Sequence, residues 1–552
     1  MRWIKIYSDV KIFRIVKLCV AFLLAAMTAY LCWPYCLKAP APDESTFLYE
    51  GLLTAQGKLP YRDFFDFIWP GTFYLIALLI KVCGGLSMIV IRIFTIGILL
   101  SCGAITLIIS SKYLPFRWLC LLGTIFWALH FPTSIQIQHH LMSGFMGVLS
   151  VFLLWKTIGK ASLSIIYLIS SGIALSLCAL FTQTLGIILI GLLTGVVFLR
   201  LRSIGINALR QQFPIFLGAI FCPLILTFIF LALNQAFSPF FYASSIWLFH
   251  GGYVQTSNHW YFFDIYPNLL GFFQNPYPSI LDCLNFLLNL FYFLLPILGF
   301  GGGIFYGIKI LCCSSPNEKD WEFLLLGWAS VGFLISTLSH SSIFHLAYNG
   351  WIPFMLGACI ISTWLKRFPK WEISILTLLF MLFYSNVSRY FKSMDYMMYS
   401  LPTVHSYGTL EKKLIWLQNL SDSTNVDRMI TDIHRLSTSG ENLFVYNLAP
   451  EFYILSGRYN PTRYQLLLSV LDTNQQILEA AKSLHQKKPS FILYEHQDER
   501  FFLLDPTFKK LRNYDYHLHP IEREIKSEYT LLYKFSHYDL FINKNRLTEN
   551  MH

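Results

Sequence analysis

Residues 39–75 read APAPDESTFLYEGLLTAQGKLPYRDFFDFIWPGTFYL and follow a long apolar run near the N-terminus. An acidic pair, Asp43 and Glu44, comes directly after that run, where the chain leaves an apolar environment. The segments Ser45–Gln56 and Gly71–Cys83 are predicted to form helices that lie along a membrane surface. The stretch therefore predicts a polar first loop, residues 38–86, on one face of a membrane protein.

The composition of the whole chain requires lipid-facing surface. Of its 552 residues, 55% are hydrophobic and 13% are charged, and the mean hydropathy is +0.51. A soluble domain carries about 25% charged residues. Apolar stretches recur as far as Arg389. We predict about eleven spans, near residues 16–37, 87–110, 118–135, 141–156, 161–180, 184–200, 213–234, 281–311, 321–338, 350–365 and 371–388. The first is predicted to be an uncleaved anchor, because its apolar run exceeds that of a signal peptide.

Basic residues orient these spans, because Lys and Arg collect in cytoplasmic loops. With the N-terminus inside, every predicted inner loop is basic, and the loops hold Lys112, Arg117, Lys156, Lys160, Arg200, Arg202, Arg210, Lys309, Lys319, Lys366, Arg367 and Lys370. Counting Gly71–Cys83 as a span would break this alternation. The net charge of +11 is thus spread over short loops, which argues against a nucleic-acid partner.

The chain after about Arg389 has the composition of a water-exposed domain. Asn442–Asn447, Ser490–Tyr494 and Tyr529–Phe535 read as short strands, and Gln475–Gln486 reads as a helix. The apolar face of that helix is predicted to hold Ile477, Leu478, Ala481 and Leu484. The predicted fold is a polytopic α-helical membrane module, residues 1–389, with a small C-terminal α/β extramembrane domain, residues 390–552, on the outer face.

Carboxylates gather in the first outer loop. Asp43 and Glu44 stand at its start, and Asp63 and Asp66 follow the first short helix. A carboxylate that takes a proton from an acceptor hydroxyl accelerates group transfer by roughly 10²–10⁴-fold. A divalent metal ion held by carboxylates is another option. The structural alternative is that the acidic pair only caps the helix and that Tyr61–Asp66 is a solvated turn.

Cations and imidazoles are expected at the same face. A phosphate leaving group needs positive charge, which Lys58, Arg62 and Arg92 could supply. A charge inside a span is costly and often functional, although Arg92 could instead snorkel to the interface. The histidines His139, His140, His340 and His345 are candidates for a phosphate or metal site. Their spacing matches no established metal signature, so hydrogen bonding to water or backbone is the alternative.

The first loop resembles that of the GT-C superfamily of membrane glycosyltransferases, and most closely its bacterial protein-mannosyltransferase-like and aminoarabinose-transferase-like branch. The resemblance rests on the acidic pair after the first span, on GKLPYRDFFD and on the following Trp69-Pro70. It implies that Asp43 activates or orients the acceptor and that Glu44 supports it. It also implies a polyprenyl-phosphate sugar donor, an inverting reaction, and weaker substrate-binding roles for Arg62, Asp63 and Asp66.

Two later segments extend the resemblance, and two others depart from it. NLFVYNLAPEFYILSGRYNPTRY (442–464) and HSSIFHLAYNGWIP (340–353) look like segments of family members. Residues 135–140 carry Gln and His where the family often has an acid, and residues 182–184 read Thr-Gln-Thr near a position that is often Lys. These departures leave the metal and the phosphate-binding cation undefined.

The sequence thus predicts an inner-membrane glycosyltransferase with a cytoplasmic N-terminus. The predicted partners are the lipid bilayer, a polyprenyl-phosphate sugar donor, and an envelope acceptor: a glycolipid such as the lipid part of lipopolysaccharide, a glycan or a protein. The predicted catalytic residues are Asp43 and Glu44, and the predicted substrate-binding residues are Arg62, Asp63, Asp66, Arg92, His139, His140 and His345. The alternatives are a transporter or flippase for lipid-linked sugars and a non-catalytic assembly factor. Few charges in mid-span and no internal repeat favour the enzyme over the transporter.

Overall fold

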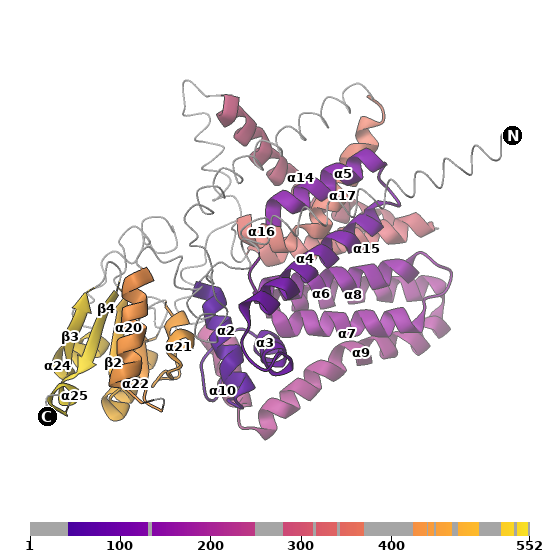
Figure 1. Cartoon of the computed structure of the whole chain (residues 1–552). Coiled ribbons are helices and arrows are strands. Elements are labelled where there is room, and N and C mark those ends of the chain that lie inside the picture. Colours follow the sequence, from indigo (N-terminus) through magenta and orange to yellow (C-terminus); the bar gives the residue numbers. More distant parts are fainter. Residues whose placement is uncertain are drawn as a thin grey trace.

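A computed structural model of the chain describes residues 42–130, 135–248, 280–312, 316–338, 343–368, 423–438, 440–446, 449–465, 473–495, 520–534 and 538–549. Figure 1 shows a bundle of long helices with a smaller α/β unit beside it. The predicted spans 16–37 and 371–388 lie outside the described residues, as does His340.

The bundle is built from the apolar helices that the sequence predicts. Its main helices are α4 (Met88–Ser110), α5 (Phe116–His130), α6 (His139–Ile158), α7 (Ile165–Phe181), α8 (Gln183–Ile204), α9 (Ile206–Leu233), α14 (Ile280–Cys312), α15 (Glu318–Leu338) and α17 (Trp351–Leu365). Each predicted span within the described ranges coincides with one of them. By length and apolar composition, α4, α6, α8 and α9 could each cross a membrane. The multi-pass helical fold is confirmed, and the number of crossings stays a prediction.

The first outer loop contains two helices outside this set. These are α2 (Pro42–Ala55) and α3 (Gly71–Val82), close to the bounds predicted. With 12 residues, α3 is about 18 Å long, too short for the roughly 30 Å of a bilayer core. The two helices touch closely at Gly51, where an added Cβ would lie 2.6 Å from Ile76 Cβ.

The two ends of the bundle differ in chemistry. At one end, Glu322 of α15 accepts hydrogen bonds from Lys112 Nζ at 2.5 Å and Tyr113 Oη at 2.6 Å. At the same end Arg200 donates to the carbonyl oxygens of Ile158 and Lys160. These cations belong to the predicted inner loops. The first residues of α4 and α6 lie at the opposite end, beside α2.

The short segments α10 (Phe237–Phe241), η1 (Tyr242–Trp247) and α16 (Ile343–Asn349) complete that opposite end. Phe240 of α10 lies against Tyr61 with ring centroids 5.0 Å apart. Trp247 of η1 lies 5.3 Å from Phe65 in the same way. Segments from the end of α9 onward therefore cover the first outer loop.

The C-terminal domain contains a four-stranded sheet in the order β1-β2-β4-β3. The strands are β1 (Leu443–Tyr446), β2 (Phe491–Glu495), β3 (Tyr529–Lys534) and β4 (Tyr538–Asn543). β1 is parallel to β2, and the other pairs are antiparallel, with Phe491 opposite both Leu443 and Ile542. The helices are α20 (Ser423–Leu436), α21 (Glu451–Ser456), α22 (Asn474–Lys487), α24 (Pro520–Glu528) and α25 (Lys544–Glu549). The sequence analysis missed β4, which begins only four residues after the end of β3.

The two faces of this sheet belong to different cores. Phe444 and Ile492 pack with α22 and α24. Leu443, Val445 and Phe491 pack in the same cluster as the first outer loop. Because successive strand residues alternate between faces, β1 is buried on both sides. Figure 1 shows the result, with α21 between the sheet and α2.

One detail of the predicted α22 is wrong. Leu478 is 58% exposed, whereas Ala480 is fully buried. On a helix of 3.6 residues per turn, Ile477, Ala480 and Leu484 share the inward face, while Leu478 is rotated about 100° away from Ile477.

Candidate active site

The acidic pair lies in the first turn of α2. The backbone of Asp43 is helical, and its side chain lies outside the described part. Glu44 is fully buried, and its carboxylate accepts hydrogen bonds from Arg92 Nη1 at 2.5 Å and from the Ile137 N–H at 2.9 Å. Arg92 also donates to the carbonyl oxygen of Ile135. Glu44 therefore ties α2 to α4 and to the segment before α6.

Three imidazoles lie beside this ion pair. His139 and His140 begin α6, and their ring centroids are 3.8 Å apart. His140 Nε2 lies 3.0 Å from His345 Nε2 of α16. His139 Nδ1 is hydrogen-bonded to Thr182 Oγ1 at 2.9 Å, and its ring meets Phe47 of α2 edge-on at 5.5 Å. The fold thus brings together predicted site residues from α2, α4, α6 and α16.

Arg62 and Asp63 lie apart from that group, on the turn after α2. Arg62 binds Asp63 through two hydrogen bonds, from Nε at 2.9 Å and from Nη2 at 3.0 Å. The guanidinium holds the pKa of the Asp63 carboxyl below its ordinary value. Arg62 Nη1 also donates to the Asn234 carbonyl at the end of α9. The Arg62 side chain is 43% exposed, so it lies at the protein surface.

Asp66 takes a third position. It is buried, and its Oδ1 accepts the Ile68 N–H at 2.7 Å. Its partner on α2 is Glu50, a residue that the sequence analysis did not single out. Burial raises the pKa of the Glu50 carboxyl well above its usual range, and the charge of Asp66 and their hydrogen bond raise it further. The protonated form of Glu50 is therefore favoured in the folded protein, where its carboxyl is hydrogen-bonded to Asp66.

Sequence reasoning missed Glu50 at this loop, and it noted Gln183 only as a departure from the family pattern. Gln183 Nε2, at the start of α8, donates to the Phe67 carbonyl at 3.1 Å and so holds the turn that carries Asp66. Tyr61 holds the same turn from within, through a hydrogen bond of 2.6 Å to the Ile68 carbonyl. The available signal for Glu50 was a single acid within the apolar stretch Phe47–Leu53 of α2.

The donor set for a metal ion is limited within the described ranges. No group of three or more His, Cys, Asp or Glu side chains is placed there to hold one ion. His140 and His345 would supply two imidazole ligands, and the nearby Glu44 is engaged by Arg92. A bound divalent ion stays a prediction.

Comparison with known proteins identifies the fold. No family model matches the chain, and no curated protein matches it in sequence. ArnT from Cupriavidus metallidurans bound to undecaprenyl phosphate matches with a TM-score of 0.52 and 11% identity, over 96% of this chain and 97% of that one. An oligosaccharyltransferase from Archaeoglobus fulgidus, in complex with Zn and sulfate, gives a TM-score of 0.49 and 11% identity over 95% of this chain and 73% of that one. ArnT in the apo state gives 0.43 and 10%, over 97% and 98%.

The first of these matches carries the fold assignment, because it covers both chains almost completely. At 11% identity it shows architecture and not chemistry. It includes both the helical bundle and the C-terminal domain. Along nearly its whole length, this multi-pass membrane protein therefore has the fold of ArnT.

Proposed function

We propose that this chain is a membrane glycosyltransferase that moves a sugar from a polyprenyl-phosphate donor to an envelope glycolipid, glycan or protein acceptor. The observation that carries the proposal is the convergence of the α2 N-terminus, Arg92 and the three imidazoles at one end of the bundle. The fold of a protein solved with undecaprenyl phosphate supports a lipid-phosphate donor. The site would face the outer leaflet of the inner membrane.

The donor phosphate would lie near the start of α6. Unpaired N–H groups and the helix dipole favour anions at a helix N-terminus. α6 has 20 residues and begins with His139 and His140, which can donate hydrogen bonds to phosphate oxygens. His345 would orient His140 through the contact between their Nε2 atoms. Arg62, Asp63 and Asp66 would bind sugar or phosphate from the turn after α2.

Asp43 is proposed as the base. It would take the proton of the acceptor hydroxyl as the acceptor oxygen forms a bond to the anomeric carbon of the sugar. The bond from that carbon to the phosphate oxygen breaks, and the leaving polyprenyl phosphate keeps the electron pair. One direct displacement of this kind inverts the anomeric configuration. The leaving charge is stabilised by fixed donors.

Glu44 would act differently from Asp43. Its carboxylate is buried, paired with Arg92 and bonded to the Ile137 N–H, so an approaching hydroxyl cannot readily use it as a base. We propose that Glu44 positions the first turn of α2 and thereby Asp43. The two neighbouring acids then have separate roles.

Mass spectrometry of envelope glycolipids and polysaccharides tests the proposal. Four strains are compared: unmodified, deleted, Asp43→Asn, and Glu528→Gln as a matched acid-to-amide control at equal membrane abundance. Glu528 is partly exposed in the C-terminal domain, 3.5 Å from Lys488. We expect the same sugar mass to be lost in the deleted and Asp43→Asn strains and to be retained in the control.

Two results would count against the proposal. Unchanged glycans in the deletion strain would contradict the proposed transferase function. A deletion phenotype that Asp43→Asn restores fully would point to the alternative, a transporter, flippase or assembly factor for lipid-linked sugars, and would remove Asp43 from catalysis.

A further inference from the structure

A short segment of the C-terminal domain, residues 458–465, is hydrogen-bonded to the first outer loop. The Phe65 N–H donates to the Arg463 carbonyl at 2.7 Å, and Phe65 forms an isolated parallel bridge with Tyr464. The Arg463 guanidinium lies 5.8 Å from the centre of the Phe65 ring. The backbone of the turn after α2 is therefore fixed by the C-terminal domain.

A second contact reaches α2 itself. Tyr49 and Tyr453 of α21 stack with ring centroids 4.8 Å apart and an interplanar angle of 22°. The Tyr49 hydroxyl accepts the Asn460 N–H at 3.1 Å. Both tyrosines are 1% exposed. Burial raises the pKa of the Tyr49 phenol, so the Tyr49 side chain stays neutral in this contact across the physiological pH range.

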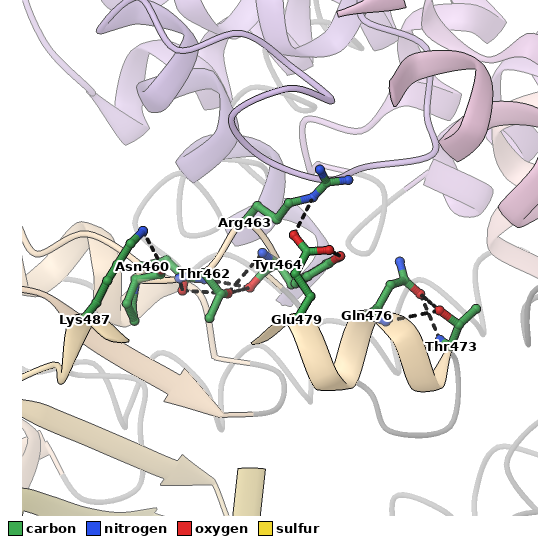
Figure 2. Close-up of polar contacts among 9 residues, drawn as sticks. Asn460, Thr462, Arg463, Tyr464, Thr473, Gln476, Glu479 and Lys487 are labelled. Atoms are coloured by element: carbon green, nitrogen blue, oxygen red, sulfur yellow. Dashed lines mark hydrogen bonds and ion pairs between the residues drawn. The ribbon is translucent and has the colours of Figure 1, made fainter. Parts of the chain in front are cut away.

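The segment that makes these contacts is braced from inside its own domain (Figure 2). Asn460 Oδ1 accepts from the Thr462 N–H at 2.8 Å, and Asn460 Nδ2 donates to the Tyr464 carbonyl at 2.6 Å. From α22, Lys487 Nζ donates to the Pro461 carbonyl at 2.7 Å. These hydrogen bonds make the segment rigid, so it moves together with the rest of the C-terminal domain. The position of that domain therefore determines the position of the contacts to α2.

The brace also includes the start and middle of α22. Tyr464 Oη donates to Glu479 Oε2 at 2.7 Å. Thr473 caps α22 in a reciprocal capping box with Gln476, and Gln476 Oε1 also accepts from Trp247 Nε1 of the membrane module at 2.9 Å. Figure 2 shows the residues of the C-terminal domain in this brace below the ribbon of the membrane module, with Arg463 directed toward it.

We propose that the C-terminal domain positions the catalytic helix: Tyr49, held by Tyr453 and the Asn460 N–H, sets the placement of α2 and of the acidic pair in its first turn. Tyr49 lies six residues after Asp43 on the same short helix. A helix is stiff over that distance, so a shift at Tyr49 moves the first turn with it. A misplacement of about 1 Å at a reacting group costs about 10²-fold in rate. Tyr49 is a positioning residue, and its effect on transfer rests on the proposed function.

The test uses three variants of the full chain in detergent micelles. Tyr49→Leu removes the stack and the acceptor. Tyr49→Phe keeps the ring and removes only the hydroxyl. Tyr529→Phe is the control, because Tyr529 is also a buried tyrosine with a hydrogen-bonded hydroxyl, which donates to the Pro489 carbonyl inside the C-terminal domain. Hydrogen exchange of the α2 amides is measured by mass spectrometry, together with the ratio of sugar-modified to unmodified glycan in cells.

We expect exchange in α2 to rise about tenfold or more in Tyr49→Leu, to rise less in Tyr49→Phe, and to match the unmodified protein in Tyr529→Phe. The glycan ratio should fall in the same order, with most activity kept by Tyr49→Phe. Unchanged α2 exchange in Tyr49→Leu would overturn the proposal, as would equal effects of Tyr49→Phe and Tyr529→Phe. If Tyr49→Leu fails to fold, the comparison of the two Phe variants decides. If the unmodified protein transfers no sugar, the proposed function fails, while the exchange result still decides the positioning role.

Discussion

Arg92 of α4 and Glu44 of α2, 48 residues apart in sequence, form an ion pair in which the two side chains are 2% and 0% exposed. The Ile137 N–H and the Ile135 carbonyl complete the set of partners. Three separate segments therefore meet at one buried pair. The sequence left two interpretations of Arg92, a functional charge or snorkelling, and burial of its guanidinium against Glu44 excludes snorkelling.

Removing one member of this pair should destabilise the protein strongly. Breaking a buried pair costs about 3–5 kcal/mol, because the remaining charge stays buried without compensation. We expect Glu44→Ala to lower the thermal transition far more than Glu528→Ala, since an exposed pair such as Glu528–Lys488 contributes about 0–1 kcal/mol. The double variant Glu44→Leu with Arg92→Met should recover most of the loss. A small effect of Glu44→Ala alone would show that the pair does not hold α2.

The Glu50–Asp66 contact predicts a stability that declines with rising pH. The pKa of Glu50 is raised in the folded protein from an ordinary value of 4.5. The folded state then keeps a proton that the unfolded state releases, so this contribution is complete below about pH 4.5 and is lost as the pH approaches the raised value. Tyr61 and Tyr74 are the other titratable groups that contribute to this environment.

Glu50→Gln isolates that contribution, because the amide donates to Asp66 at every pH. We expect its transition temperature between pH 5 and pH 9 to fall less steeply than that of the unmodified protein, with Glu528→Gln as the control. Parallel pH profiles for Glu50→Gln and the unmodified protein would rule out the shared proton.

The contact between α2 and α3 predicts that alanine substitutions at two glycines have different effects on thermal stability. An added Cβ at Gly51 would meet Ile76, whose branched side chain has little rotamer freedom. Overpacking of this kind costs about 1–3 kcal/mol. Gly97, on α4, has nothing within 4 Å of an added Cβ, and alanine favours a helix over glycine by about 1 kcal/mol. Thermal unfolding should therefore separate Gly51→Ala, which destabilises, from Gly97→Ala, which does not. Equal shifts for the two would contradict this packing.

Arg62 should affect binding more than stability. Its side chain is solvent-exposed, and its strongest partner, Asp63, is its neighbour in sequence. We expect Arg62→Gln to leave the transition temperature unchanged and to raise the KM for the lipid-linked donor while kcat stays constant, as for a contact made equally in ground and transition states. An Arg62→Gln protein with a lower transition temperature and an unchanged KM would reverse this interpretation.

The sequence by itself determined the architecture of this protein. Apolar runs such as Met88–Ser110 and Gln183–Ile204 are long enough to require lipid, so the helices of the bundle follow from composition and length. The bounds of α2, α3, β1 and β2 also follow from local periodicity and turn residues. Each of these elements is determined by residues that are close together in the sequence, so a local pattern is sufficient to predict it.

Only the tertiary structure decided which polar residues meet. The carboxylates of the first loop look like one group in sequence, yet Glu44 pairs with Arg92, Asp63 with Arg62 and Asp66 with Glu50. The contact of Tyr49 with Asn460 joins residues 411 positions apart. Such partners are selected by how helices pack and by the cost of leaving a buried charge or N–H unpaired. Because most of these partners lie in different segments of the chain, no pattern within a single segment predicts them.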